Sequence, residues 1–266
     1  MGTAVLLEDK VVVVTGVGPG LGRAMAIEAG AEGAKVVCVA RSQNVIDAVA
    51  TEIADAGGEA LAVAADVTSA DDCATVAAAT EDRFGRIDGL INSAFSPGAI
   101  TRFEDADDDA WPAAFDVNVF GTLKFIRASL DLLRRDGGGA VVNVNTASAV
   151  RPMEAQGGYG ASKAAMEFLT RQLAVELGPS GVRLNTVYCG PMLGPSLDMA
   201  FSFWAAQQNR SVDEVTADLA ANMALRRIPA DEEVAQTIVM LLSDKASAMT
   251  GAAVAVTGGF GLEQRM

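Results

Sequence analysis

The 266-residue sequence contains no histidine, and this absence restricts its possible chemistry more than any other feature of its composition. Without an imidazole group the chain has no Ser-His-Asp triad, no Cys-His pair and no histidine-based metal site. Any acid or base that acts near neutral pH must therefore be a carboxylate, a lysine, a cysteine or a tyrosine with a shifted pKa.

Cysteine is scarce as well, because only Cys38, Cys73 and Cys189 are present and they lie far apart in the chain. They match neither a disulfide framework nor a zinc cluster, so we expect small buried side chains in a reducing compartment. No charged leader precedes an apolar segment, and no apolar run reaches the roughly 18 residues of a membrane span. We therefore expect a soluble, cytoplasmic protein with no metal site and no membrane partner.

The chain carries few positive charges for its length. Lysine and arginine total 20 against 34 aspartate and glutamate residues, which gives a net charge of −14. Such an acidic protein repels nucleic acid and anionic lipids, so neither is expected as a partner. Half of the residues are hydrophobic, and no glycine- or proline-rich linker divides the sequence. We expect residues 1–266 to form one globular domain.

Short apolar runs alternate along the chain with longer alanine-rich segments of helical periodicity. Several runs are continuous and rich in β-branched residues, as in parallel strands that are buried on both faces. The pattern predicts an α/β Rossmann-type fold, a doubly wound parallel sheet of seven strands with helices on both faces. The expected strands are 10–15, 35–40, 60–65, 87–92, 140–146, 183–188 and 252–257, and the expected helices are 20–33, 42–57, 70–84, 107–136, 158–178 and 231–243.

Residues 191–230 break this alternation with an apolar stretch followed by an amphipathic segment. The segment follows the carboxyl end of the sixth expected strand, and ligands of doubly wound sheets bind beyond the carboxyl ends of the strands. We therefore predict a substrate lid at 191–230. The alternative is a pair of surface helices that covers the core.

The first expected strand runs directly into the glycine-rich stretch TGVGPGLG at residues 15–22. Gly16, Gly20 and Gly22 allow a tight turn, the close approach of a pyrophosphate and close packing of the next helix. The N-terminus of that helix offers free N–H groups to an anion. The position of the turn between a strand and a helix predicts a dinucleotide-binding site.

The second expected strand ends without the acidic residue that commonly binds the ribose 2′-hydroxyl of NAD(H). Ala40 and Arg41 stand there instead, and a guanidinium group suits a 2′-phosphate. NADP(H) is therefore favoured, with NAD(H) as the alternative. At the next two strand ends, we expect Asp66 to accept from the adenine amino group and Asn92 to tie neighbouring strands near the cofactor.

The motif YGASK places Tyr159 and Lys163 four residues apart at the start of an expected helix. That spacing puts both side chains on one face of the helix. An ammonium group near a phenol favours the phenolate, so it lowers a tyrosine pKa that starts at about 10. Tyr159 is therefore the candidate acid/base of a chain without histidine.

In their order along the chain, these motifs resemble the short-chain dehydrogenase/reductase family. The set comprises TGVGPGLG, DV at 66–67, LINSA at 90–94, DVNVFG at 116–121, YGASK, and VTGG at 256–259. The resemblance implies a metal-independent, NAD(P)-linked oxidoreductase that forms a homotetramer or homodimer. It also adds four residues to the expected cofactor contacts: Leu21, Val67, Gly190 and Met192.

The resemblance further implies a catalytic tetrad of Asn118, a hydroxyl residue, Tyr159 and Lys163. By this analogy Tyr159 transfers the proton, and Lys163 holds the nicotinamide ribose. Asn118 would hold a water molecule that links Lys163 to solvent. Within FDVNVF the asparagine is a poor helix former among apolar residues, which agrees with a local distortion of the helix.

Thr146 and Ser148 are the two candidates for the hydroxyl residue of the tetrad. Thr146 lies thirteen residues before Tyr159, the separation that is common in the family, although the family usually has serine there. Ser148 lies eleven residues before Tyr159. Both side chains point the same way in a strand, with a separation of about 7 Å. We therefore predict that Thr146 binds the substrate oxygen and that Ser148 is a second hydroxyl beside the substrate.

Other positions depart from the family pattern around the expected cofactor site. Ser93 and Phe95 replace a second asparagine and a glycine, and Cys189-Gly190 replaces a proline-glycine pair. A threonine that often contacts the nicotinamide carboxamide would fall near Gly194. These changes affect the shape of the pocket and the nicotinamide contacts, but they leave the proton-transfer residues in place.

The expected reaction is reversible hydride transfer between NADP(H) and a secondary alcohol or ketone. Apolar residues near the site predict a bulky hydrophobic or cyclic substrate, and they are equally consistent with ordinary core: Phe95, Val150, Met153, Met192, Leu193, Phe201, Phe203 and Trp204. Two functions without redox chemistry are the alternatives. A nucleotide-binding regulator would be expected to lose Tyr159 or Lys163, and a cofactor-free lyase would be expected to lose the glycine turn.

Overall fold

Seven parallel strands form a single sheet in the order β3-β2-β1-β4-β5-β6-β7. The computed structural model describes residues 5–106, 109 and 111–262; the side chains of 196–197, 199–200 and 203–204 lie outside that description. The strands are β1 (Val11–Thr15), β2 (Lys35–Ala40), β3 (Glu59–Ala64), β4 (Gly89–Asn92), β5 (Ala140–Thr146), β6 (Arg183–Cys189) and β7 (Ala253–Val256). All seven predicted strands are therefore present, with ends that differ from the predicted ones by at most two residues.

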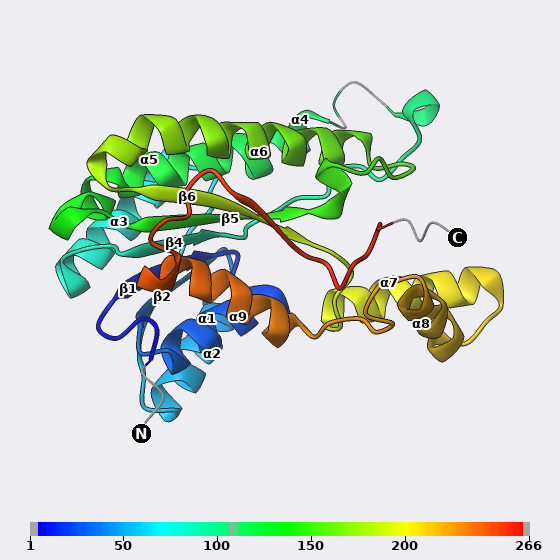
Figure 1. Ribbon diagram of the computed structural model, residues 1–266, viewed down its shortest axis with the longest axis horizontal. Coiled ribbons are helices and arrows are strands. Elements are labelled where there is room, and N and C mark those ends of the chain that lie inside the picture. Colours follow the sequence, from blue (N-terminus) through cyan, green and yellow to red (C-terminus); the bar gives the residue numbers. More distant parts are fainter. Residues whose placement is uncertain (1–4, 107–108, 110, 263–266) are drawn as a thin grey trace.

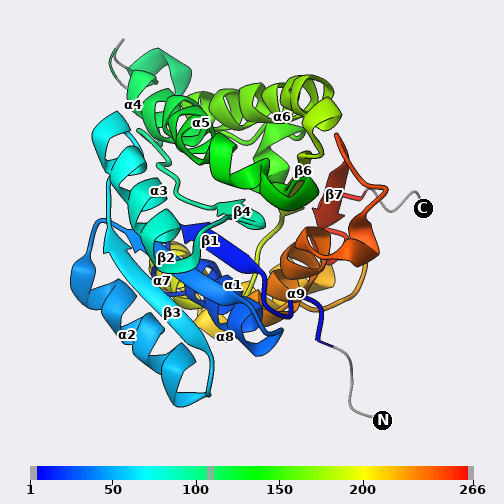
Figure 2. The ribbon, with the colours of Figure 1, turned by 90° about the vertical axis from the view of Figure 1, so that its left-hand side faces the viewer.

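Helices cover both faces of the sheet, so the predicted doubly wound architecture is confirmed (Figures 1 and 2). One face carries α1 (Leu21–Ala31), α2 (Gln43–Asp55) and α9 (Asp231–Leu242), and the other carries α3 (Ala70–Phe84), α5 (Thr122–Leu133) and α6 (Gly157–Leu177). Among the helices that the structure describes, none combines the length and the apolar character needed to cross a membrane.

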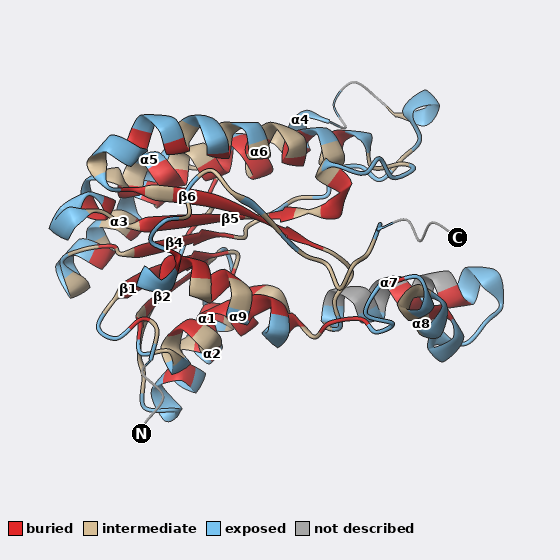
Figure 3. Cartoon of the chain, viewed as in Figure 1, coloured by how far each residue is buried: buried red, intermediate tan, exposed pale blue. Residues whose placement is uncertain are grey.

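The alternation of side chains along the central strands produces two apolar layers, one on each side of the sheet. Val12 and Val14 of β1 pack with Met25 and Ile238 from the helices of the first face. Their neighbours in β1 pack instead with helices of the second face, as in the contact layer that contains Val13, Phe125 and Leu133. Figure 3 shows the resulting burial, which is highest along the inner strands of the sheet and lower along the edge strands β3 and β7. Each buried side chain of this size contributes about 1.5–3 kcal/mol.

The predicted helix 107–136 is wrong as a single element. Residues 107–108 and 110 lie outside the described part of the chain, and the remainder forms α4 (Pro112–Phe115), a π-helical segment (Asp116–Gly121) and α5. The wider turn of a π-helix is common at functional sites, and here it buries the side chain of Asn118. The distortion that we expected at this asparagine is therefore present.

Residues 191–230 contain α7 (Pro195–Gln208) and α8 (Val212–Ala221), which lie together at one end of the molecule (Figure 1). They have an apolar cluster of their own, formed by Phe201, Ala205, Val215, Met223 and Ile228. A short parallel bridge between Leu193 and Ala230 closes the base of this segment. We refer to the two helices and their cluster as the α7–α8 unit.

Candidate active site

Two neighbouring cavities lie at the carboxyl ends of the strands. One of about 460 Å³ is lined from the ends of β5 and β6, and one of about 420 Å³ from the ends of β2 and β3. The turn after β1 and the loop after β4 contribute Gly16, Gly18, Ser93 and Phe95 to both cavities. The strand order reverses direction between β1 and β4, which is the place where doubly wound sheets bind their ligands. We call the first cavity the reaction cavity and the second the adenosine cavity.

The glycine turn between β1 and α1 is so tightly packed that larger residues do not fit. A Cβ atom on Gly22 would lie 2.2 Å from the carbonyl oxygen of Gly16, and one on Gly16 would lie 2.5 Å from the amide nitrogen of Ala94. Gly20 is the N-cap of α1 with a φ of 93°. Because it has no side chain, it leaves the first N–H groups of α1 beside the reaction cavity, where they suit an anion.

The adenosine cavity is lined by Ala40, Arg41, Asp66 and Val67, as the sequence predicted for this end of the site. The Asp66 carboxylate accepts hydrogen bonds from the backbone N–H and the hydroxyl of Thr68, at 2.9 and 2.7 Å. These bonds, together with the positive charge of Arg41, hold the pKa of Asp66 below its usual range. The carboxylate therefore stays ionised beside the guanidinium.

Asn92 lies inside the sheet and is not among the residues that line the two cavities. Its amide nitrogen donates to Oδ1 of Asn143 on β5 at 2.9 Å, and the amide nitrogen of Asn143 donates to the hydroxyl of Thr170 on α6. The expected tie between neighbouring strands is therefore present. It fixes the end of β4 beside the reaction cavity.

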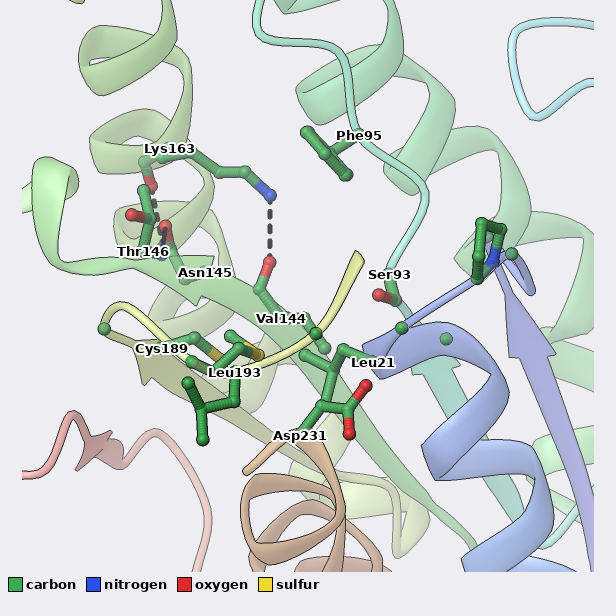
Figure 4. Close-up of a pocket in the computed structure, with 18 of the residues that line it drawn as sticks. Leu21, Ser93, Phe95, Val144, Asn145, Thr146, Lys163, Cys189, Leu193 and Asp231 are labelled. Carbon is green, nitrogen blue, oxygen red and sulfur yellow. Dashed lines mark hydrogen bonds between the residues drawn. The ribbon is translucent and has the colours of Figure 1, made fainter. Parts of the chain in front are cut away.

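Tyr159 and Lys163 both face the reaction cavity from the first two turns of α6. Lys163 is buried, and its Nζ donates to the carbonyl oxygen of Val144 at 2.9 Å (Figure 4). Nζ lies 6.0 Å from the centre of the Tyr159 ring. Burial lowers the pKa of Lys163 to about 8. The spacing of the YGASK motif thus brings the two side chains to the same cavity.

The pKa of Tyr159 differs from our expectation, because it is raised to about 12 rather than lowered. Burial of the phenol is the main cause, the thiol of Cys189 adds to it, and a hydrogen bond with Thr146 opposes both. Lys163 does not offset these effects, because its own pKa of about 8 means that the side chain has lost its charge before the phenol titrates. The phenol is therefore protonated at neutral pH.

Asn118 is bound by protein groups on every side of its amide. Its nitrogen donates to the carbonyl oxygen of Ser96 at 2.8 Å and to the hydroxyl of Ser162 at 2.9 Å, and its oxygen accepts from the N–H of Ser96 at 2.8 Å. The side chain therefore clamps the loop after β4 against α6. This contact differs from the water-holding role that the family resemblance implies.

Thr146 and Ser148 face different surroundings, because β5 ends at Thr146 and the chain turns into a 3₁₀ turn at Ala147–Ala149. Thr146 lines the reaction cavity and hydrogen-bonds with Tyr159. The hydroxyl of Ser148 donates to Oε1 of Gln156 at 2.8 Å and contacts the sulfur of Met153 at 3.3 Å. Ser148 and Met153 are therefore absent from the lining of the reaction cavity, contrary to our expectation for both.

The other predicted contacts separate into two groups. Leu21, Phe95, Gly190, Met192 and Leu193 line the reaction cavity as expected. Val150 is 62% exposed outside it, and Phe201 is buried within the α7–α8 unit. The side chains of Phe203 and Trp204 lie outside the described part of the structure.

Sequence reasoning missed three residues that line the reaction cavity: Val144, Asn145 and Asp231. Asn145 donates to the carbonyl oxygen of Lys163 at 2.9 Å and accepts from the N–H of Thr146 at 2.8 Å, so it fixes two of the candidate residues. Its polar side chain in an apolar strand was the available signal. Nothing in the sequence marked Asp231 as a site residue, because acidic residues are common at the start of a helix.

No group of three or more metal-ligating side chains occurs among the residues described. The phenol, ammonium and hydroxyl groups of Tyr159, Lys163 and Thr146 are the candidate chemical groups, and all three line the reaction cavity. The lining of the same cavity includes the glycine turn, which suits an anion. This combination suits a dinucleotide whose reactive end lies beside a proton donor.

Known proteins are similar in sequence to this chain over nearly its whole length. A family model described as enoyl-(acyl carrier protein) reductase matches residues 16–261. The chain is 34% identical to the short-chain reductase protein NovJ of Streptomyces niveus, over 95% of this chain and 94% of that protein. It is 33% identical to 2-(S)-hydroxypropyl-CoM dehydrogenase 3 of Xanthobacter autotrophicus, over 95% and 97%.

Solved structures agree with these relatives. L-sorbose reductase from Gluconobacter frateurii, complexed with NADPH and L-sorbose, superimposes with a TM-score of 0.92 at 26% identity, covering 98% of this chain and all of that one. An actinorhodin polyketide ketoreductase with NADPH gives 0.89 at 27% identity, covering 96% and 98%. The chain therefore belongs to the short-chain dehydrogenase/reductase family, and it is an NAD(P)-dependent oxidoreductase that interconverts a secondary alcohol and a ketone by hydride transfer.

Proposed function

We propose that this enzyme uses NADP(H) to interconvert a hydrophobic, bulky or cyclic ketone and its secondary alcohol, with Tyr159 as the acid/base. The observation that carries the proposal is the shared lining of the reaction cavity. Tyr159, Lys163 and Thr146 stand on one side of it, and the glycine turn stands on the other. A proton donor and an anion-binding helix terminus thus face the same space.

The residues of both cavities fit a dinucleotide. The packing of Gly16 and Gly22 leaves the N-terminus of α1 open to a diphosphate, which a larger residue would block. Gly190 and Met192 line the far side of the reaction cavity, where the nicotinamide half of the cofactor would lie. When bound, the nicotinamide supplies or accepts the hydride.

Arg41 supports NADP(H) over NAD(H). It is exposed at the end of β2, lines the adenosine cavity and has no ion-pair partner among the described residues. β2 ends in Ala40, so no carboxylate stands there to bind a ribose 2′-hydroxyl and repel a 2′-phosphate. The solved relatives named with NADPH support the same choice.

The proton-transfer steps follow from the state of Tyr159. Because burial raises its pKa to about 12, the phenol holds its proton at neutral pH and is ready to donate it to a carbonyl oxygen. The Thr146 hydroxyl donates a second hydrogen bond to that oxygen, where negative charge develops. In the oxidation of an alcohol the phenol must first lose its proton, and the hydrogen bond with Thr146 favours that loss because it lowers the pKa of Tyr159.

We assign positioning roles to the remaining members of the tetrad. Lys163 faces the cavity close to Tyr159, so its ammonium group is placed to hold the nicotinamide ribose. Asn118 fixes the loop that carries Phe95 through its bonds with Ser96. Leu193 and Phe95 give the cavity apolar walls, and the α7–α8 unit next to them is the proposed substrate lid.

The assembly and the compartment are also proposals. The α6 helix leaves Phe168 and Val175 exposed by 61% and 75%, which supports association of copies into a homodimer or homotetramer. Reduced, separate cysteines support a cytoplasmic location. Light scattering after size-exclusion chromatography tests the assembly.

The function is tested with purified enzyme and a panel of ketones, alcohols and one enoyl thioester, each with NADPH, NADH and their oxidised forms. We expect NADPH-dependent reduction of hydrophobic or cyclic ketones. In the Tyr159→Phe variant we expect a loss of about 10²–10⁴-fold in kcat, with NADPH binding retained. Reduction of the enoyl thioester alone would overturn the carbonyl assignment, and a wild-type protein that binds no nicotinamide cofactor would overturn the whole proposal.

A further inference from the structure

Asp231 places a carboxyl group inside the reaction cavity, next to the glycine turn. It is the first residue of α9 and is 8% exposed. Its Oδ2 lies 3.1 Å from the position that a Cβ on Gly194 would take and 3.7 Å from that of a Cβ on Gly20. Figure 4 shows the side chain on the same side of the cavity as Leu21 and Leu193. The absence of side chains at Gly20 and Gly194 thus makes room for this carboxyl group.

Asp231 is the only carboxylate among the described residues that line this cavity. The other ionisable side chains in the lining, Tyr159, Lys163 and Cys189, come from α6 and the end of β6 rather than from the glycine turn. Burial, a hydrogen bond with Glu232 and the charge of Glu232 raise the pKa of Asp231 to about 6. Arg23 of α1 is the cation that faces it and opposes this rise.

Arg23 compensates little of the charge of Asp231, because its guanidinium is already bonded to Glu52 of α2. Asp198, in the first turn of α7, is exposed and is not part of the cavity lining. Glu233 of α9 is paired with Arg227. A second anion that enters this end of the cavity therefore meets the Asp231 carboxylate without a free cation beside it in the described lining.

We propose that Asp231 takes up a proton from solvent when the dinucleotide binds, so that the carboxyl group beside the diphosphate is neutral. The inference rests on the proposed function, because the diphosphate is what brings negative charge to the N-terminus of α1. Two like charges in a site of this kind cannot both stay ionised without a large loss of affinity. Protonation of Asp231 removes that repulsion.

The affinity for the dinucleotide should fall as the pH rises, because binding is linked to protonation of Asp231. Near pH 6 about half of the free enzyme already carries the proton, so binding is tight. As the pH rises, a growing share of the binding free energy is spent on protonating Asp231, and the affinity falls. The decline continues until the pH exceeds the pKa of Asp231 in the complex. A difference of one pKa unit between the two states corresponds to about tenfold in the dissociation constant.

The experiment measures NADPH binding by fluorescence between about pH 6 and pH 8 for the wild type, Asp231→Asn and Asp198→Asn. We expect the wild-type dissociation constant to rise by about tenfold over this range and that of Asp198→Asn to follow it. The Asp231→Asn variant should bind more tightly at pH 8 and change by about twofold or less. The 2′-phosphate of NADPH also titrates at about pH 6, but its contribution is common to all three proteins.

Calorimetry of the wild-type enzyme in two buffers of different ionisation enthalpy provides a second measurement that needs no variant. We expect the wild type to take up protons when it binds NADPH at pH 7. The Asp231→Asn variant should take up fewer, because it lacks the carboxyl group that accepts the proton. Equal pH dependence in the wild type and Asp231→Asn, or no uptake by the wild type, would overturn the role of Asp231 while leaving the proposed function intact. A wild type that binds no NADPH at any pH contradicts the proposed function instead.

Discussion

The hydroxyl of Thr146 accepts a hydrogen bond from the N–H of Ser148 at 3.3 Å, while the hydroxyl of Ser148 points to Gln156. This contact is a tight turn at the end of β5, and it brings the two hydroxyl oxygens to 3.5 Å from each other, closer than the roughly 7 Å of an extended strand. Thr146 remains with Tyr159 in the reaction cavity, and Ser148 is committed to a partner outside it.

The first prediction concerns these two hydroxyl groups. Thr146→Val should lower kcat by about 10²–10³-fold, because it removes a donor to the substrate oxygen and keeps the shape of the side chain. Ser148→Ala should lower it far less. Thr146→Ser restores the hydroxyl and should recover most of the activity, which separates a chemical role from packing. Steady-state assays that rank the two variants in the opposite order contradict the assignment.

The second prediction concerns cofactor choice. Arg41→Ala should raise the KM for NADPH by about 10–100-fold, because a charged hydrogen bond to a phosphate contributes about 1.5–3 kcal/mol. The KM for NADH should change by about twofold or less. Arg102→Ala, at an exposed arginine that is paired with Glu154 and is not among the lining residues of either cavity, serves as the matched control. Equal losses with both cofactors would show that Arg41 does not recognise the 2′-phosphate.

The third prediction concerns the stability cost of Lys163. Because its pKa falls from 10.5 to about 8 on folding, the folded protein binds fewer protons than the unfolded chain between these values. Wild-type stability therefore gains a contribution as the pH rises from 8 to 10.5. Lys163→Met should be inactive yet more stable at pH 7 by up to about 3 kcal/mol, and this advantage should shrink towards pH 10.5.

Urea unfolding at several pH values measures this difference. Lys245→Met, at an exposed lysine in the short turn after α9, is the control and should show neither effect. An unchanged unfolding free energy in Lys163→Met at pH 7 would mean that the bond with Val144 fully offsets the burial of the charge.

The fourth prediction concerns Phe95, whose ring lies 6.4 Å from that of Tyr159 at an angle of 56°. Phe95→Ala should raise the KM for a cyclic ketone by about tenfold, because it removes one apolar wall and an aromatic contact of about 0.5–1.5 kcal/mol. Bulkier ketones that fill the enlarged cavity should lose less. Phe103→Ala, at an exposed ring that packs on Trp111, is the control. A uniform loss across the ketone panel would contradict a role in substrate selection.

The fold followed from local signals in the sequence, because continuous β-branched runs such as VVVVT at Val11–Thr15, in alternation with longer helical segments, are typical of parallel strands buried on both faces. The glycine turn and the YGASK spacing located the cavity for the same reason, since short-range geometry determines both. The π-helical segment was indicated by one misplaced residue, Asn118. The break at α4 was not, because a four-residue helix has no period to detect.

The parts of the site that were missed depend on contacts between distant segments. The pKa of Tyr159 is raised mainly by burial, which is not visible in the spacing of the motif. The position of Ser148 depends on Gln156, which the turn after β5 brings close. Asp231 reaches the cavity because α9 packs on α1, some 200 residues earlier in the chain.

The α7–α8 unit packs its apolar side chains on each other rather than on either face of the sheet. It contacts the body through the bridge between Leu193 and Ala230 and through the segment after β7, where Phe260 packs against the cluster. Substitutions within the unit therefore disturb the main core little, so natural variation can reshape the substrate-binding wall without rebuilding the cofactor site. The same modularity makes residues 194–229 a natural segment to exchange between relatives when a new ketone is to be accommodated.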